Sequence, residues 1–115
     1  MTSKELAMLC AQGADHRKGE EVVVLDLRGK SSIADFFVIV SGTSEPHLKA
    51  IREEIEDRAR EQGTRVRGVD GFPMSHWVVL DFVDTVVHVF SRERRDFYAI
   101  ERLWGDAPRL DWTLA

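Results

Sequence analysis

The sequence predicts a single α+β domain, in which a mixed, mostly antiparallel sheet of about five strands packs with three helices. Strand-length apolar runs alternate with segments whose apolar residues recur at helical spacing, in the order αββαββ(β)α. The 115 residues are 43% hydrophobic and 31% charged, which is typical of one globular domain, and no repeat or linker interrupts them. We assign residues 1–108 to this domain and residues 109–115 to a C-terminal tail.

The first helix is expected over residues 2–16. Thr2 and Glu5 have the spacing of a capping box, and the apolar residues that follow form one stripe. The apolar runs 22–27 and 35–41 then read as strands. Their short connection favours an antiparallel pair.

A second helix is expected after the turn Gly42-Thr43-Ser44. Thr43 or Ser44 is the N-cap, and Pro46 is acceptable in the first turn. Gly63 is a natural residue to follow the end of this helix. One side of it is apolar and the other is charged, so it should cover one face of the sheet.

The second half of the chain predicts a short strand at 65–69, a loop rich in Gly and Pro, a hairpin and a last helix at 93–104. Ser91 is a possible cap of that helix. Its buried stripe is expected to consist of Phe97, Ile100, Leu103 and Trp104.

The hairpin at 77–90 is apolar on both sides, so both of its faces require cover. A turn at Val83-Asp84 pairs Leu80 with Val87. One face is then aliphatic, whereas the other carries Trp77, Asp81, His88 and Phe90. We expect Asp81 to hold His88 by a hydrogen bond. Because three helices scarcely cover two sheet faces, a second copy or a partner should cover the surplus apolar surface.

Charge and cysteine content restrict the classes of partner and compartment. A net charge of −4 argues against a non-specific nucleic-acid binder and favours a protein or small-molecule partner. The single cysteine, Cys10, fits a reducing cytosol and reads as a buried core residue. Neither a membrane-spanning run nor a signal peptide is indicated, so we expect a cytoplasmic protein.

Catalytic and metal sites find little support. The Ser41–His47 segment reads as a capping turn in preference to an anion site, because it lacks the P-loop pattern. A nucleotidyltransferase would require paired acids, and the nearest candidates are Asp81 and Asp84, which their spacing puts on opposite sides of a strand end. The four histidines have no metal-ligand spacing, and no nucleophile motif is present. We predict no cofactor, no metal and no enzymatic activity.

Two further features point to partners. Trp77, at the edge of a loop beside Met74, suits either an interface or the core. The basic run Arg92–Arg95 reads as a solvated helix start, with a local RNA-phosphate contact as the minority interpretation.

Several motifs together resemble the Iojap family, the ribosomal silencing factors. They are ADFFVIVSGTSEPHLKAI, HWVVLD, VVHVF and DFYAIERLWGDAP, and the resemblance spans roughly Leu6 to Pro108. The chain departs from the family pattern at Glu45-Pro46, where an Arg is usual, and at Val83, where a Gly is usual. The family positions carried over are Asp35, Gly42, Thr43, Ser44, His47, Trp77, Asp81, His88, Phe90, Arg95, Tyr98, Glu101, Leu103 and Trp104.

The resemblance implies a nucleotidyltransferase-like topology without the catalytic acids. It further implies binding to the large ribosomal subunit through its protein fourteen, a block to joining of the small subunit, repression of translation when nutrients are short, and a homodimer in the free state. We expect Met74, Ser75, Trp77, Asp81 and Tyr98 to form the contact. The alternative is a nucleotidyltransferase-like nucleotide-binding protein or enzyme that uses Gly42–Ser44 and Asp81.

Overall fold

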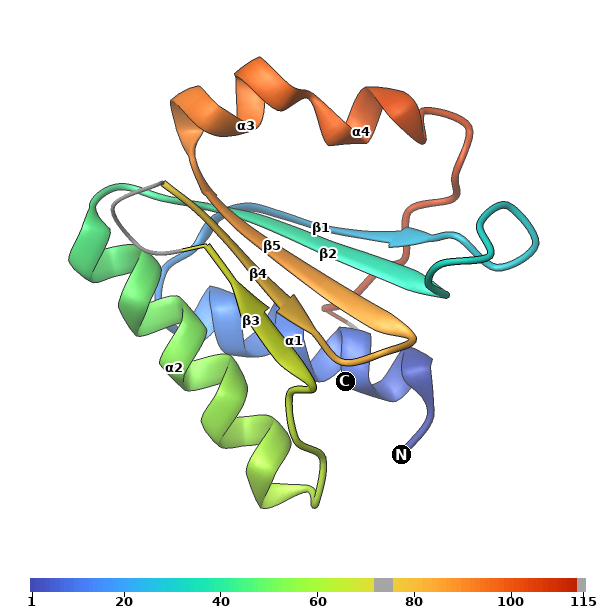
Figure 1. Ribbon diagram of the computed structural model, residues 1–115, viewed down its shortest axis with the longest axis horizontal. Helices are drawn as coiled ribbons and strands as arrows, with labels where there is room; N and C mark the ends of the chain where they lie inside the picture. The colour runs from blue at the N-terminus through green and yellow to red at the C-terminus, as the bar shows by residue number, and fades with distance from the viewer. Residues whose placement is uncertain (72–75, 114–115) are drawn as a thin grey trace.

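A computed structural model of the chain, described over residues 1–71 and 76–113, contains one five-stranded sheet with helices on both faces (Figure 1). The strand order is β1-β2-β5-β4-β3, and the pairs are antiparallel except for the parallel pair β2·β5. The elements are α1 (Ser3–His16), β1 (Glu20–Asp26), β2 (Phe36–Gly42), α2 (Glu45–Glu61), β3 (Gly68–Asp70), β4 (Trp77–Asp81), β5 (Thr85–Ser91), α3 (Arg92–Tyr98) and α4 (Ile100–Leu103). The predicted fold class is confirmed.

Local signals place the first two helices where they were predicted. Thr2 and Glu5 form the capping box of α1, with the Glu5 N–H donating to Thr2 Oγ1 at 3.0 Å. Ser44 caps α2, and its hydroxyl accepts from the His47 N–H at 3.2 Å. Gly63, just beyond α2, has φ +77°, a conformation that favours glycine.

The hairpin register is confirmed, with Leu80 opposite Val87 and Trp77 opposite Phe90. Val83 occupies the turn at φ +79°, which is unusual for a β-branched residue. The short strand β3 begins three residues later than the predicted start, at Gly68 instead of Arg65.

The first face of the sheet, which α1 and α2 cover, is sealed. Its core is aliphatic apart from two phenylalanines, and Cys10 is fully buried within it as predicted. Burial raises the pKa of the Cys10 thiol well above its usual range, so the thiol stays protonated. Fully buried members include Val38, Val40, Leu48, Ile51, Ile55, Val78, Leu80, Val87 and Val89.

The second face is covered by α3, α4 and the chain that follows them (Figure 1). Its core contains Leu25, Ile39 and Phe90, with Ile100 and Trp104 packed against it. Most of the surplus apolar surface expected from the sequence is therefore covered within one copy. What stays partly open on this face is the β4 side, where Trp77 and Val79 are only half-buried.

The predicted last helix is wrong in two respects. Ala99 has φ 48°, in the left-handed region, and breaks the helix into α3 and α4. Phe97 and Leu103, expected in a buried stripe, are 74% and 76% exposed. Because of the break, only Ile100 and Trp104 of the predicted stripe pack against the sheet, whereas Phe97 and Leu103 face solvent.

The predicted tail lies along β1 as far as it is described. The Pro108 carbonyl accepts from the Asp26 N–H at 2.8 Å, and the Leu110 N–H donates to the Val24 carbonyl at 2.9 Å. The indole N–H of Trp112 donates to the Val22 carbonyl at 3.0 Å. Within the described ranges, no helix is long and apolar enough to cross a membrane.

Candidate partner-binding surface

Four rings form a cluster on the second face. They belong to Trp77 on β4, His88 and Phe90 on β5, and Tyr98 on α3. The Trp77 ring stacks on Phe90 with centroids 4.9 Å apart, and Tyr98 covers Trp77 with centroids 4.4 Å apart. The Trp77 indole N–H donates to His88 Nδ1 at 3.3 Å. Trp77 therefore packs on the core, as one of the two interpretations of the sequence expects, and it is still partly exposed at the surface.

His88 is a member of this cluster and has little solvent exposure. Burial lowers the pKa of His88 to about 4, so the ring is neutral at physiological pH. Because Nδ1 accepts the indole hydrogen bond, the proton is on Nε2, and this buried Nε2 has no hydrogen-bond partner among the described residues.

The predicted hydrogen bond from Asp81 to His88 is wrong. Asp81 is paired with Val86 in the hairpin, and its carboxylate binds the Arg67 guanidinium and the Val83 N–H. These contacts hold the pKa of Asp81 below its usual range, with the Arg67 hydrogen bond as the main cause. Asp81 therefore fixes the hairpin turn and does not form part of the ring cluster.

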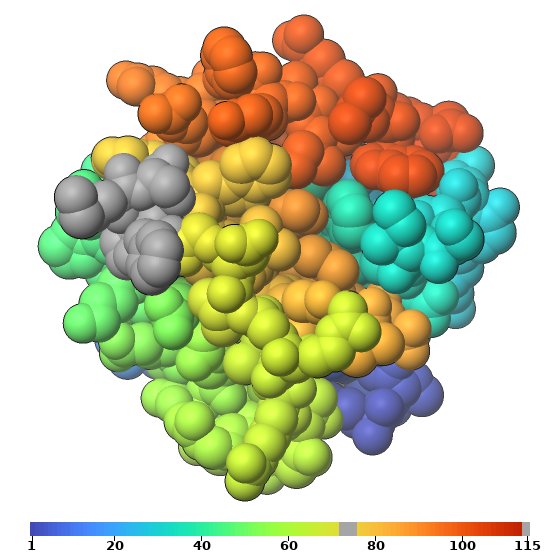
Figure 2. All heavy atoms as spheres, viewed as in Figure 1, coloured from blue at the N-terminus to red at the C-terminus, as the bar shows by residue number. Residues whose placement is uncertain are grey.

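An open groove of about 260 Å³ runs between α3 and the strands β3 and β4. We call it the aromatic groove; it is lined by Asp70, Gly71, Trp77, Val79 and Tyr98. Figure 2 views the face on which the orange α3–α4 layer borders the yellow side chains of β3 and β4. The structure thus brings Trp77 and Tyr98 of the predicted contact together. Asp81 does not line this groove, and Met74 and Ser75 lie outside the described residues.

Arg95 anchors α3 to the sheet, and this contradicts a fully solvated basic run. The Arg95 side chain is 6% exposed and binds Glu101 Oε1 at 2.6 Å and Ser41 Oγ at 3.0 Å. Arg92 and Arg94 are exposed as predicted. Because Arg95 and Glu101 lie on either side of Ala99, their ion pair connects α3 to α4 across the break.

The turn from Gly42 to His47 is a capping structure, in agreement with the preferred reading of the sequence. A Cβ at Gly42 would lie 2.6 Å from Leu48 Cδ2, so only glycine fits without movement. The Thr43 N–H donates to His47 Nδ1 at 2.9 Å, and His47 Nε2 donates to the Arg17 carbonyl at 2.7 Å.

Most of the remaining family positions make contacts within the fold. Asp35 accepts a hydrogen bond from Ser3 Oγ at 2.9 Å and joins the starts of β2 and α1. Trp104 meets Phe37 edge to face, with ring centroids 6.3 Å apart. Leu103 is the exception, since its side chain points into solvent.

Asp81, which the nucleotidyltransferase alternative requires beside the Gly42 turn, lies away from that end of the sheet. Gly42 is paired with Ser91, whereas Asp81 lies opposite Val86, five residues earlier on β5. At about 3.3 Å per residue, the level of Gly42 and the level of Asp81 are roughly 17 Å apart along β5. Among the described residues, no group of three His, Cys, Asp or Glu side chains could hold a metal ion.

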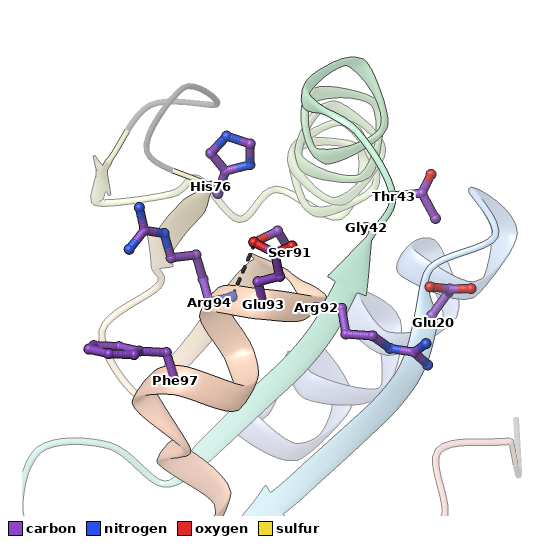
Figure 3. Close-up of a pocket in the computed structure, with 9 residues that line it drawn as sticks. All are labelled: Glu20, Gly42, Thr43, His76, Ser91, Arg92, Glu93, Arg94 and Phe97. Carbon is purple, nitrogen blue, oxygen red and sulfur yellow. Dashed lines mark hydrogen bonds between the residues drawn. The ribbon is translucent and has the colours of Figure 1, made fainter.

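A larger hollow of about 710 Å³ lies at the carboxyl ends of β2 and β5 (Figure 3). We call it the strand-end hollow; it is lined by Glu20, Gly42, Thr43, His76, Ser91, Arg92, Glu93, Arg94 and Phe97. No local pattern in the sequence predicts this hollow, because β2 and β5 are remote in the chain and are brought together only by their pairing in the fold.

Comparison with known proteins decides the family. The family model described as "Ribosomal silencing factor during starvation" matches residues 1–114. The chain belongs to this family. The resemblance inferred from the sequence motifs is therefore confirmed.

Other ribosomal silencing factors match along almost their whole length. The ribosomal silencing factor RsfS of Halalkalibacterium halodurans is 42% identical over 111 residues, which are 96% of this chain and 95% of that protein. Its counterpart in Bacillus subtilis is 40% identical over 96% of this chain and 94% of its own length. The chloroplastic protein Iojap of Zea mays is 32% identical over 91% of this chain but 46% of its own length.

Solved structures of similar proteins have the same fold. A crystal structure of a Chromobacterium violaceum protein matches with a TM-score of 0.87 and 30% identity, over 91% of this chain and 88% of that one. A second, from Bacillus halodurans, matches with a TM-score of 0.81 and 38% identity, over 94% of this chain and 98% of that one. The names of the silencing-factor relatives describe regulatory factors and not enzymes.

Proposed function

We propose that this protein represses translation by binding the large ribosomal subunit through its protein fourteen and thereby blocking the joining of the small subunit. The observation that carries the proposal is the match of residues 1–114 to the family of ribosomal silencing factors. In this proposal the protein acts in the cytoplasm, where its target is, uses neither cofactor nor catalysis, and forms a homodimer when free.

The aromatic groove is the surface we assign to the ribosomal protein. Trp77 supplies a large ring that is held in place by Phe90 and His88, so little conformational freedom is lost on binding. Tyr98, 42% exposed, supplies a second ring with a polar tip. Aromatic residues that are rigid and partly exposed are enriched among the residues that dominate binding energies.

Charge favours a basic partner at this surface. Asp70 lines the groove, and the chain as a whole carries a net charge of −4. A ribosomal protein that contacts RNA is basic, so its field would steer association with an acidic domain. The exposed Arg92 and Arg94 are available for a minor contact with ribosomal RNA. Arg95 is buried and does not take part in this contact.

The nucleotidyltransferase alternative loses its catalytic basis. It required Asp81 beside Gly42–Ser44, and these groups lie toward opposite ends of β5. A metal-dependent transfer needs acids that converge on one ion, and no such group is found within the described residues.

Sedimentation of purified ribosomal subunits on sucrose gradients tests the proposal. The protein should move with the large subunit and should shift joined ribosomes toward free subunits. Joining that is unaffected by a saturating amount of protein would refute a steric block. Light scattering of the free protein tests the homodimer separately.

The groove is tested with variants at its exposed positions. Tyr98→Ala and Asp70→Lys should each weaken co-sedimentation by about tenfold, because they remove an aromatic anchor or reverse a complementary charge. Asp15→Lys is the matched control, since Asp15 is an exposed acid on α1. If Asp15→Lys weakens binding as much as Asp70→Lys, net charge and not the groove determines affinity.

A further inference from the structure

The strand-end hollow occupies a position that the chain topology singles out. β2 and β5 are parallel neighbours, and the chain leaves β2 for α2 on the first face but leaves β5 for α3 on the second face (Figure 1). Open sheets bind ligands in the crevice that forms where such connections diverge, outside the carboxyl ends of the strands. The volume of about 710 Å³ is within the range of small-molecule sites.

One arginine in the hollow is available for a ligand. Arg92 is paired with Glu21 at 3.3 Å, and Arg95 is paired with Glu101 at 2.6 Å. Arg94 comes from the same helix, but no carboxylate of the described chain lies within ion-pair distance of its guanidinium. A guanidinium of this kind binds a phosphate with two parallel hydrogen bonds.

An aromatic ring lies beside this arginine. Phe97 follows Arg94 by one helical turn, and in Figure 3 both side chains extend to the same side of α3. Phe97 is 74% exposed, and its only described ring contact is edge to face with the adjacent Tyr98, with centroids 5.1 Å apart, so a face of the Phe97 ring is open to a ligand. Residues spaced in this way have Cβ atoms about 5–6 Å apart, a separation that one nucleotide spans between its phosphate and its base.

We propose that the strand-end hollow binds one nucleoside phosphate, with the phosphate on Arg94 and the base stacked on Phe97. Stacking on an aromatic ring accepts any base, so the site should show little sequence preference. Glu20 and Glu93 also line the hollow. Their carboxylates repel a phosphate and accept hydrogen bonds from sugar hydroxyls or base amino groups, which keeps the phosphate at the Arg94 end.

The source of this nucleotide is either an RNA strand or a free nucleotide in solution. An RNA strand would extend the minor ribosomal RNA contact proposed above, and in that respect the inference rests on the proposed function. Binding should not require a divalent metal, because the described residues hold no cluster of acids that could bind one.

The experiment titrates the full-length chain with two probes, at low salt and with EDTA present. One probe is a short single-stranded RNA of mixed sequence, followed by fluorescence anisotropy; the other is AMP or GMP, followed by calorimetry. We expect saturable binding of at least one probe. Arg94→Gln and Phe97→Leu should each weaken it by about tenfold, and salt should weaken the RNA complex further.

Arg65→Gln provides the matched control, because Arg65 is an exposed arginine on the α2–β3 connection and its loss changes net charge equally. It should alter affinity by less than about twofold. Binding of RNA alone, of free nucleotide alone or of both supports the site and identifies its source. The absence of saturable binding for both probes, or an equal loss in Arg65→Gln and Arg94→Gln, would overturn it.

The same variants separate this inference from the proposed function. If neither probe binds while the unaltered protein still sediments with large subunits, the hollow is not a nucleotide site and the silencing role is untouched. If nucleotide binds but the protein does not sediment with large subunits, the silencing proposal fails and the site stands.

Discussion

The two faces of the sheet use alternate residues of the same strands but differ in how completely they are covered. On the first face, neighbouring residues of β4 such as Val78 and Leu80 are fully buried under α1 and α2. On the second face, Trp77 and Val79 of the same strand are half-buried and line the aromatic groove. An aliphatic face packs tightly and has no polar atoms to satisfy. The second face contains a buried histidine, is covered by two short helices and is partly open along β4. This open part leaves surface that a partner could contact.

The largest difference between the two faces is expected when adjacent residues of β4 are truncated. Leu80→Ala removes a fully buried side chain on the first face and should lower the free energy of unfolding by about 2–5 kcal/mol. Val79→Ala, one residue earlier on the half-open second face, should lower it by less than about 1 kcal/mol. Urea denaturation measures both. Equal losses would mean that the two faces contribute alike to stability.

The second face should respond to acid through His88. Its pKa is about 4 in the folded protein and near 6.5 in the unfolded chain, so below pH 6.5 the unfolded state binds the extra proton first. Stability from this residue is therefore complete above pH 6.5 and is lost as the pH falls toward 4. Between pH 8 and pH 5 the loss should be on the order of 2 kcal/mol.

The control for this measurement is His88→Gln, which cannot take up a proton. Urea midpoints of the two proteins should diverge with pH over this window, with the unaltered protein falling more steeply. Carboxylates with lowered pKa values, such as Asp26, Glu54 and Asp81, lose their contributions at lower pH. Parallel pH profiles for the two proteins would show that His88 is not protonated selectively in the unfolded state.

The smallest effect is expected on the outer side of α4. Leu103 is 76% exposed, so Leu103→Ser should change the free energy of unfolding by less than about 0.5 kcal/mol. Ile33→Ser, at an equally exposed loop position, is the control. A loss of more than about 2 kcal/mol in Leu103→Ser alone would place Leu103 in a core contact after all.

The sequence was most informative where local chemistry decides the structure. The capping box at Thr2, the Ser44 cap and the hairpin register at Leu80 and Val87 all depend on residues close in the chain. The recognition of Trp77 and Tyr98 as neighbours came from the family resemblance and a loop-edge tryptophan, and the structure places their rings in contact.

The rest depended on contacts that no local pattern encodes. Ala99 adopts a left-handed conformation without a glycine to signal it, and the buried Arg95 is balanced by Glu101 and by Ser41 on a distant strand. Asp81 was assigned to His88 because both face the same side of the hairpin, but Arg67 competes for it successfully. The parallel pairing of β2 with β5, which creates the strand-end hollow, joins segments separated by half of the chain.

Residues 108–112 close one rim of the sheet, because their backbone and the Trp112 indole take up hydrogen-bonding groups of β1 that would otherwise face outward. The opposite rim is β3, and it is only three residues long. A foreign strand could therefore extend this sheet by a few hydrogen bonds at most, and the protein has little tendency to polymerise by that route.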